Sequence, residues 1–336
     1  MNIYSCVDGN NIDKIIVLFN SVYVNSSNKN LKFYILTDKY TEKITSIPKY
    51  LDNIINIKQL NWDNKWKNIL DKFNNNFYID AKWCKNNMNF ARFLFFKHFP
   101  KVDRVIYLDW DMIVIDDIYK LKSHYDNFQN IIVAKCGKQN VFHNIFTREY
   151  KQHSKLLSIY TRSKMMNHHV KKIINLLNLE QKDFFKVNAF NAGFYIISNN
   201  HFNENSLLNL LEKLIDIQIK FKCFNFGTQV VMNLICLNNR IFIDKKWNHL
   251  PNIDNLESLS IIHWNGKKKP WHKDNITEKN NIWYKYYLMI YPDKKNIYKI
   301  VSNKKNTIKN EKIKTNNKKI IKKNVNVDLI KFLARR

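Results

Sequence analysis

Residues 104–114 read RVIYLDWDMIV, an apolar run interrupted by two aspartates. Side chains two residues apart on an extended segment point to the same face, so we expect Asp109 and Asp111 to project together, with Trp110 facing the opposite way. Two anions held side by side in an apolar frame are costly in free energy unless a cation neutralises them. The segment therefore predicts either a divalent metal site that can hold a diphosphate or a strand that ends in two solvated aspartates.

Apolar runs of strand length alternate with segments of helical periodicity along most of the chain. We expect strands at 3–7, 31–36, 54–57, 105–108, 131–134 and 194–197, and helices at 11–24, 87–98, 205–220 and 228–237. This repeated order predicts an α/β fold with a mainly parallel central sheet flanked by helices. Ligands of such sheets bind beyond the carboxyl ends of the strands, where Asp8, Asp38 and the Asp109/Asp111 pair are expected.

The 336 residues are 45% hydrophobic, which is enough for one large packed domain or two small ones. Five cysteines without a Cys-x-x-Cys pair argue against a disulfide framework and a structural zinc site, and they fit a reducing compartment. The first residues show no secretory signal, and no run of about eighteen apolar residues occurs. We therefore expect a cytoplasmic protein that is at most peripheral to a membrane.

The formal net charge of +28 is concentrated at the C-terminal end. Residues 294–336 contain 13 Lys and 2 Arg against Glu311 and Asp328, a net charge of +13. Such a segment can bind anionic lipid, nucleic acid or an acidic glycan, or it can be a solvated extension. We expect residues 276–336 to form an aromatic and then Lys-rich extension, partly disordered, with an anionic membrane surface as its favoured partner.

Two further segments interrupt the alternation of strands and helices. Residues 137–186 are polar and basic, and we interpret them as an insertion over one face. The adjacent His168 and His169 within it point in different directions on a helix, which favours surface histidines over a metal site. Residues 282–291 (IWYKYYLMIY) form an aromatic patch, for which packing is the default interpretation and a membrane interface is the alternative.

Six short blocks place polar or charged residues at the expected ends of strands and helices. They are SCVDGN at 5–10, NFAR at 89–92, YLDWD at 107–111, FNAG at 190–193, GTQ at 227–229 and IHWNGKKKPW at 262–271. In this order they resemble the retaining glycosyltransferases of family eight, which include bacterial lipopolysaccharide galactosyl- and glucosyltransferases and glycogenin. The resemblance covers residues 1–275, and several independent blocks in sequence are more specific than any one motif.

The resemblance implies a GT-A fold, a nucleotide-sugar donor that is usually a UDP-sugar, and a manganese ion, with magnesium as the alternative. Asp109 and Asp111 match the metal-binding Asp-x-Asp of the family, and His263 matches its third protein ligand. Two carboxylates and one imidazole form a mixed oxygen and nitrogen donor set, which suits manganese better than calcium. His263 precedes Gly266 and three lysines, which favours the ligand role over that of an isolated core histidine.

The resemblance also implies which residues hold the donor diphosphate. Gly266 and Lys269 match family residues that contact it, and Arg92 matches an arginine near the donor sugar and the diphosphate. The diphosphate becomes more negative as the bond to the sugar breaks. A bound divalent ion, Lys269 and Arg92 would stabilise that charge where it develops.

The base and the sugar of the donor are matched by a further set of residues. Asp8 matches the carboxylate that reads the uracil, and Asn10 lies in the same block. Asn191 and Gly193 match positions that line the sugar pocket. Gln229 matches the glutamine beneath the reacting sugar carbon.

Two positions depart from the family pattern. The family often carries an aromatic residue beside the first-strand aspartate, where it stacks on the base, and this chain has Asn11 there. The residue before the glutamine is commonly an aspartate that contacts the donor sugar, and this chain has Thr228. The insertion at 137–186, near the expected acceptor side, is longer than the simple bacterial pattern. These departures bear on the choice of base, sugar and acceptor.

We therefore expect a metal-dependent hexosyltransferase that moves a hexose from UDP-glucose or UDP-galactose to a glycan, glycolipid or protein acceptor, with retention of the anomeric configuration. Gln229, Asp111 and Arg92 are the expected catalytic residues. The alternative is a basic nucleic-acid-binding or membrane-binding protein built on an inactive transferase fold. Charge alone gives only non-specific nucleic-acid binding, so no specific nucleic-acid partner is expected.

Overall fold

The computed structural model describes residues 1–39, 47–76, 86–135, 175, 188–221, 228–251, 258–266, 268–272 and 278–294. The chain divides into two compact units, Met1–Gly266 and Lys267–Arg336. The sequence places the boundary of the catalytic domain at residue 275, and this boundary stays a prediction. The insertion predicted at 137–186, with His168 and His169, lies outside the described residues apart from its single position 175.

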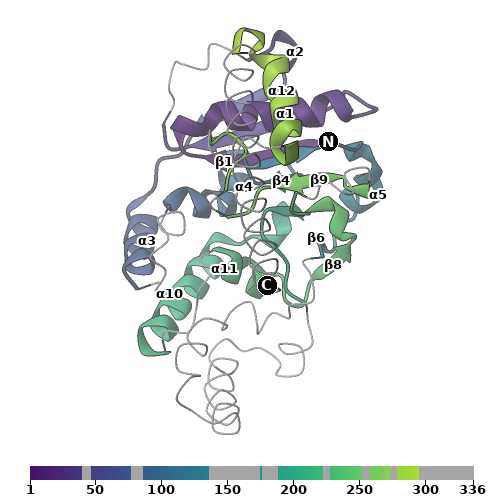
Figure 1. The fold of residues 1–336 in the computed structure, drawn as a ribbon. Helices are drawn as coiled ribbons and strands as arrows, with labels where there is room; N and C mark the ends of the chain where they lie inside the picture. Colours follow the sequence, from purple (N-terminus) through teal and green to yellow (C-terminus); the bar gives the residue numbers. More distant parts are fainter. Residues whose placement is uncertain are drawn as a thin grey trace, which may run out of the picture. The chain divides into compact units, whose positions relative to one another are not determined.

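The first unit is built on a seven-stranded sheet in the order β3-β2-β1-β4-β7-β6-β8. Figure 1 labels β1, β4, β6 and β8 of this sheet. Its strands are β1 (Asn2–Val7), β2 (Lys32–Thr37), β3 (Ile55–Gln59), β4 (Arg104–Leu108), β6 (Ile131–Ala134), β7 (Phe194–Ser198) and β8 (Arg240–Ile243). β7 runs antiparallel to both of its neighbours, and the other pairs are parallel. The sheet is mainly parallel, as predicted, so β1, β2 and β4 end at the same edge.

Helices cover both faces of this sheet. Successive side chains of a strand point to opposite faces, and those of the central strands are buried on both. On one face, Phe33 of β2 stacks on Phe19 of α1 (Ile12–Asn25), with ring centroids 4.5 Å apart. On the other face, Tyr4 of β1 packs against Phe95 of α4 (Phe95–His98), at 4.4 Å. Tyr4 shares its hydrophobic core with side chains of α3 (Asn64–Asn76), α10 (Glu204–Phe221) and α11 (Thr228–Ile235).

Shorter helical segments complete the first unit. They are the α-helices α2 (Lys49–Asp52) and α5 (Lys122–Tyr125) and the 3₁₀ helices η1 (Gly9–Asn11), η2 (Asn87–Phe93), η3 (Ile118–Leu121), η4 (Asn199–His201) and η5 (Lys245–Trp247). The segment 87–98 is helical, as predicted, but its first seven residues form the 3₁₀ helix η2 and only its last four are α-helical. Met88, Phe90 and Phe93 of η2 are all buried, so the segment is covered on several sides and lacks the single apolar stripe of an amphipathic α-helix.

A separate two-stranded antiparallel sheet joins β5 (Met112–Val114) to β9 (Ile261–His263). Three residues separate the end of β4 from the start of β5, so Asp109, Trp110 and Asp111 form the connection between the two sheets. The apolar residues that resume after Asp111 in the sequence are this short strand. Its partner comes from the far end of the first unit.

The second unit is described over 268–272 and 278–294. The aromatic patch of the sequence lies in α12 (Glu278–Ile290), which is followed by the 3₁₀ helix η8 (Pro292–Lys294). Trp283 and Tyr286 are buried, and the Trp283 ring lies 5.5 Å from that of Trp271, which agrees with packing. Within the described residues, no helix is both long enough and apolar enough to cross a membrane. The basic segment from residue 295 onwards lies outside them.

Candidate active site

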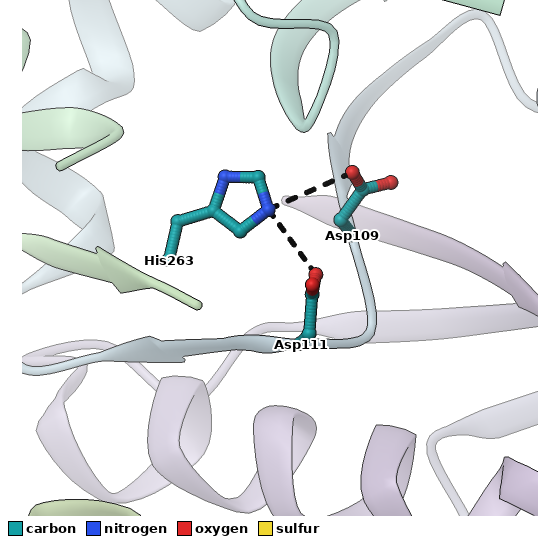
Figure 2. Close-up of side chains that lie close together, drawn as sticks. All are labelled: Asp109, Asp111 and His263. Atoms are coloured by element: carbon teal, nitrogen blue, oxygen red, sulfur yellow. Dashed lines mark ion pairs between the residues drawn. The ribbon is translucent and has the colours of Figure 1, made fainter. Parts of the chain in front are cut away.

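Asp109 and Asp111 converge on His263, the last residue of β9 (Figure 2). His263 Nε2 lies 3.2 Å from Asp111 Oδ1 and 3.8 Å from Asp109 Oδ2. One ligand atom from each side chain lies within 4.8 Å of the other two. Asp111 and His263 are buried, and Asp109 is half-buried. The fold thus brings together the three side chains that the sequence predicts as metal ligands.

Main-chain pairing fixes the distance between Asp111 and His263. Met112 of β5 pairs with His263 of β9, so the residue before one strand lies beside the last residue of the other. The Trp264 backbone N–H donates to the Asp111 carbonyl oxygen at 3.0 Å and extends this pairing. Trp264 is buried, as expected for a packing residue.

Asp109 is held by two donors on the atom that points away from His263. Its Oδ1 accepts from the Tyr107 hydroxyl at 2.6 Å and from Arg92 Nη2 at 3.1 Å, whereas its Oδ2 is the atom nearest His263. Burial raises the pKa of Tyr107 well above its usual value, so this hydroxyl remains a donor. One carboxylate oxygen is therefore anchored by the protein while the other faces the cluster.

Arg92 lies behind Asp109, with its guanidinium over the Tyr107 ring at 4.7 Å. It also donates from Nε to the Asn89 carbonyl at 2.8 Å and from Nη1 to the Ala192 carbonyl at 2.7 Å. Burial alone would lower the pKa of Arg92, but Tyr107 and Asp109 raise it above its usual value. In the structure Arg92 anchors Asp109, and its contact with the donor stays a prediction.

His263 is fixed on the side opposite the carboxylates. Its Nδ1 lies 2.8 Å from Asn248 Oδ1, so the ring is hydrogen-bonded on one nitrogen and faces the aspartates with the other. A Cβ added to Gly193 would lie 2.5 Å from His263 Cε1 and 2.7 Å from Met112 Cε. The close approach of the His263 ring therefore requires a glycine at position 193. This requirement is separate from the predicted role of Gly193 in lining the sugar pocket.

Asn191 connects this part of the cluster to Gln229. Asn191 Nδ2 donates to Gln229 Oε1 at 3.2 Å, and Asn191 Oδ1 accepts from the Gly193 backbone N–H at 2.9 Å. Gln229 lies in the first turn of α11, directly after the buried Thr228. The residues predicted to surround the donor sugar are therefore joined to each other by hydrogen bonds.

Asp8 follows β1 at the sheet edge that also carries Asp109, because β1 and β4 are parallel neighbours. Both oxygens of the Asp8 carboxylate accept from Asn11 Nδ2, at 2.9 and 3.0 Å. Asn11, which replaces the aromatic residue common in the family, thus orients the expected base reader. Asn10 is exposed. The Gly9 backbone N–H donates to Asp38 Oδ1 at 2.8 Å, which ties the ends of β1 and β2 together.

Gly266 and Lys269, which are expected to hold the diphosphate, belong to different units of the chain. Gly266 has a φ of 95°, a left-handed conformation that glycine adopts readily, and no atom lies within 4 Å of where its Cβ would be. The backbone, and not the available space, therefore requires a glycine. Lys269 belongs to the second unit, so its role in binding the diphosphate stays a prediction.

The donor set of the cluster fits a divalent cation. With a neutral His263, the charges of Arg92, Asp109 and Asp111 sum to minus one in a largely buried place. The hydrogen bond at His263 Nδ1 leaves Nε2 as the ring nitrogen beside the carboxylates, which is the arrangement of metal-ligating histidines. Asp109 Oδ2, Asp111 Oδ1 and His263 Nε2 would hold the ion.

The sheet order, with one antiparallel strand in a mainly parallel sheet and the Asp-x-Asp at its edge, is that of a GT-A fold. The family model described as Glycosyl transferase family 8 matches residues 2–275. The chain belongs to this family. The family predicted from the sequence blocks is therefore confirmed, as is the fold class.

Solved structures agree with the fold. The galactosyltransferase LgtC, in complex with donor and acceptor sugar analogues, superposes with a TM-score of 0.59 at 15% identity, over 86% of this chain and 96% of that chain. GlyE from Streptococcus pneumoniae gives a TM-score of 0.52 at 18% identity, over 90% of this chain and 62% of that chain. These likenesses establish the fold.

The sequence relatives include two plant proteins. Probable galacturonosyltransferase-like 4 from Arabidopsis thaliana is 27% identical over 55% of this chain and 49% of its own length. Probable galacturonosyltransferase-like 9 from the same organism is 29% identical over 56% of this chain and 45% of its own length. The matched region thus spans about half the length of each of these relatives.

Two residues of the site carry no signal in the sequence that we used. Asn248 lies after η5 in a segment without a family block, and only the fold places it against His263. Tyr107 lies within the block 107–111, but the block alone does not predict the hydrogen bond from its hydroxyl to Asp109. A tyrosine two residues before a carboxylate on the same strand face is the signal that could have identified it.

Proposed function

We propose that this protein transfers a hexose from a UDP-sugar, UDP-glucose or UDP-galactose, to a glycan, glycolipid or protein acceptor, in a manganese-dependent reaction that retains the anomeric configuration. The observation that carries the proposal is the cluster of Asp109, Asp111 and His263 at the carboxyl edge of the sheet, in a chain of this family. Magnesium is the alternative ion, since the two carboxylates also suit it.

In the proposed reaction, the acceptor oxygen bonds to the anomeric carbon as the bond from that carbon to the phosphate oxygen breaks. The acceptor proton passes to the departing phosphate oxygen. Asp109, Asp111 and His263 would hold a divalent ion, whose charge would stabilise the diphosphate as it leaves. Gln229 presents an amide, which is not the carboxylate nucleophile of a covalent double displacement, so we propose attack from the same face in one step.

The proposal names both the base and the sugar of the donor, and each can be tested. Asp8, oriented by Asn11, is the proposed reader of the base. Two relatives are named as galacturonosyltransferase-like proteins, so a uronic acid donor belongs in the comparison with the two neutral hexoses. Thr228 stands where the family commonly has an aspartate that contacts the donor sugar. We propose that the contact with Thr228 differs between these sugars.

The experiment is a donor screen with the full chain and manganese, across UDP-glucose, UDP-galactose, UDP-galacturonic acid, a GDP-sugar and a CDP-sugar. We expect turnover with a UDP-sugar, loss of turnover with a chelator, and a loss of about 1,000-fold in Asp111→Asn, because several kcal/mol of charge stabilisation depend on the metal. Asp103→Asn, an exposed aspartate just before β4, is the matched control and should keep wild-type turnover. Near-normal turnover of Asp111→Asn would contradict the proposal.

The basic C-terminal segment is proposed to hold the enzyme at an anionic membrane surface on the cytoplasmic side, since its net charge is +13 over residues 294–336. Deletion of 294–336 should abolish co-sedimentation with vesicles containing phosphatidylserine and leave donor turnover unchanged. Equal sedimentation of the deleted and full chains would refute this role. Binding to nucleic acid in place of vesicles, with no turnover of any donor, would favour the inactive transferase fold.

A further inference from the structure

Four polar side chains form a continuous chain of hydrogen bonds, here called the amide relay: Gln229, Asn191, Asn248 and His263. Gln229 Oε1 accepts from Asn191 Nδ2 at 3.2 Å. Asn248 Nδ2 donates to both the side-chain and the backbone oxygen of Asn191, each at 3.2 Å. Asn248 Oδ1 lies 2.8 Å from His263 Nδ1. The relay joins the residue expected beneath the reacting carbon to the expected metal ligand.

The direction of each amide in the relay is determined by the main chain. The Asn191 backbone carbonyl can only accept, so the Asn248 atom beside it must be the nitrogen, and Asn248 presents its oxygen to His263. The Gly193 backbone N–H can only donate, so the Asn191 atom beside it must be the oxygen, and Asn191 presents its nitrogen to Gln229. Neither amide can be reversed without losing a hydrogen bond to a backbone group.

The orientation of Asn248 has a direct consequence for the imidazole. An oxygen facing Nδ1 requires the proton on Nδ1, and in the neutral ring this leaves the lone pair on Nε2. Without Asn248, the nearby carboxylate oxygens at 3.2 and 3.8 Å would draw a proton onto Nε2 and block metal binding. We propose that Asn248 is a positioning residue that keeps His263 in the metal-binding tautomer and couples it to Gln229. This rests on the proposed function.

The turn formed by Asn191, Ala192 and Gly193 extends this coupling to the carboxylate side. The Ala192 carbonyl accepts from Arg92 Nη1 at 2.7 Å, and the Gly193 carbonyl accepts from the Asp109 backbone N–H at 2.8 Å. The same turn therefore orients Asp109 through Arg92 and its own backbone, and His263 through Asn248. The metal ligands and Gln229 share one support, so a change at Asn248 should be felt at both.

The first experiment measures the tautomer directly, in metal-free full-length protein labelled with ¹⁵N. Long-range ¹H–¹⁵N spectra at mildly alkaline pH, where a free imidazole is neutral, report which ring nitrogen carries the proton. His263→Asn identifies the signals by their absence. We expect Nδ1 to be protonated in the wild type and to lose its proton in a large fraction of Asn248→Ala molecules. An unprotonated Nδ1 in the wild type would overturn the proposal, whatever the enzyme's activity.

The second experiment measures manganese binding by calorimetry in the absence of donor. Asn248→Ala and Asn248→Leu should weaken binding by about 10- to 100-fold, as loss of a hydrogen-bond partner of a metal-ligating histidine does. Asn248→Asp keeps an acceptor for His263 but no donor for Asn191, so it should bind manganese well and have a reduced kcat. It is also the variant to use if the first two do not fold.

Asn2→Ala is the matched control, because Asn2 is also a half-buried amide that bridges elements, through the Arg104 carbonyl at 3.0 Å, but at the opposite end of β1. It should bind manganese like the wild type. Binding by folded Asn248→Ala and Asn248→Leu within twofold of the wild type would refute the positioning role. If the wild type binds manganese through the Nδ1–H tautomer but turns over no nucleotide sugar, the relay stands and the proposed function fails.

Discussion

Two buried arginines at the two ends of the central sheet provide a comparison. Arg92, 5% exposed, faces Asp109 beyond the carboxyl end of β4 and donates to three oxygens. Arg104, 2% exposed, opens β4 at the other end, donates from Nη1 to the Tyr125 carbonyl at 2.7 Å and lies 4.0 Å from the Phe128 ring. Its Nε and Nη2 are buried without a hydrogen-bond partner among the described residues.

The difference between them is whether another charge offsets the cost of burial. Burial lowers the pKa of Arg104, whereas Asp109 and Tyr107 reverse that effect at Arg92 and raise its pKa. Arg104 is held by packing and one carbonyl, and Arg92 is held by the charge of the candidate metal site. A buried arginine is therefore a guide to a functional site only together with its partners.

The largest effect on stability should come from Arg92→Met. The substitution leaves the Asn89 and Ala192 carbonyls without this donor and removes the cation beside Asp109, so we expect a loss of about 3 kcal/mol in the free energy of unfolding. Urea denaturation followed by circular dichroism measures it. A loss no larger than that of Arg104→Met would break the comparison.

Gly193→Ala should affect the metal site more than the fold. The added Cβ would lie 2.5 Å from His263 Cε1, so the ring must move away from Asp109 and Asp111. We expect manganese affinity to fall by about 10-fold or more, comparable with loss of support for a metal ligand. Calorimetric titration with manganese gives the value, and wild-type affinity would show that the ring can shift at no cost.

Arg104→Met should change stability by no more than about 1 kcal/mol. The variant loses one hydrogen bond and the contact with Phe128, but it also removes two buried nitrogens that lack partners, and these terms oppose each other. The same urea titration measures it. A loss of several kcal/mol would mean that Arg104 is held by more than packing and one carbonyl.

The smallest effect should come from an exposed pair, which sets the scale for charges that are not buried. Lys97 Nζ lies 2.7 Å from Glu204 Oε1. Burial raises the pKa of Glu204, but hydrogen bonds from Lys97 and Trp66 lower it by more, so the pKa lies below its usual value. Glu204→Gln should cost about 0.5 kcal/mol at neutral pH.

The pH dependence of that cost has a defined sign. A carboxyl with a lowered folded-state pKa stabilises the fold above its unfolded pKa of about 4.3, and this contribution is lost as the pH falls through the folded value. Thermal denaturation of wild type and Glu204→Gln should therefore converge in acid. A difference that grows as the pH falls would contradict the assignment.

The sequence predicts the parts of the fold that depend on local pattern. The buried strands β1, β2 and β4 are continuous apolar runs, and the carboxylates at their ends can be placed at one edge by the rule for parallel sheets. The antiparallel direction of β7 is not predicted, because the apolar pattern of a strand does not show its direction. The strands β5 and β8 are not predicted either, because three or four residues are too few to show a period. The strand end expected at His263 is the end of β9. A helix is predicted where η2 lies, but its 3₁₀ geometry is not, because burial of this segment on several sides depends on the tertiary fold.

The candidate site is predictable to the extent that its residues lie in motifs. Asp109, Asp111 and His263 are found by the family resemblance, and the structure brings them together. Asn248 is not found, because an asparagine in a connection has no characteristic neighbours, and its function depends on which backbone oxygen lies beside it. The hydrogen bond from Arg92 to Asp109 is likewise not predicted, because it depends on the burial of Arg92 and on the direction of its side chain, which local sequence does not determine.

The pairing of β5 with β9 has a consequence for how the protein is made. Two of the candidate ligands are two residues apart in the chain, but the third follows Asp111 by about 150 residues and lies in the last strand of the first unit. A nascent chain that has not yet emerged beyond residue 263 has no complete cluster, and closing so long a loop is slow compared with local folding. Binding of the proposed manganese ion would therefore report the completion of folding, and the ion should protect the newly made chain from proteolysis only after β9 has docked.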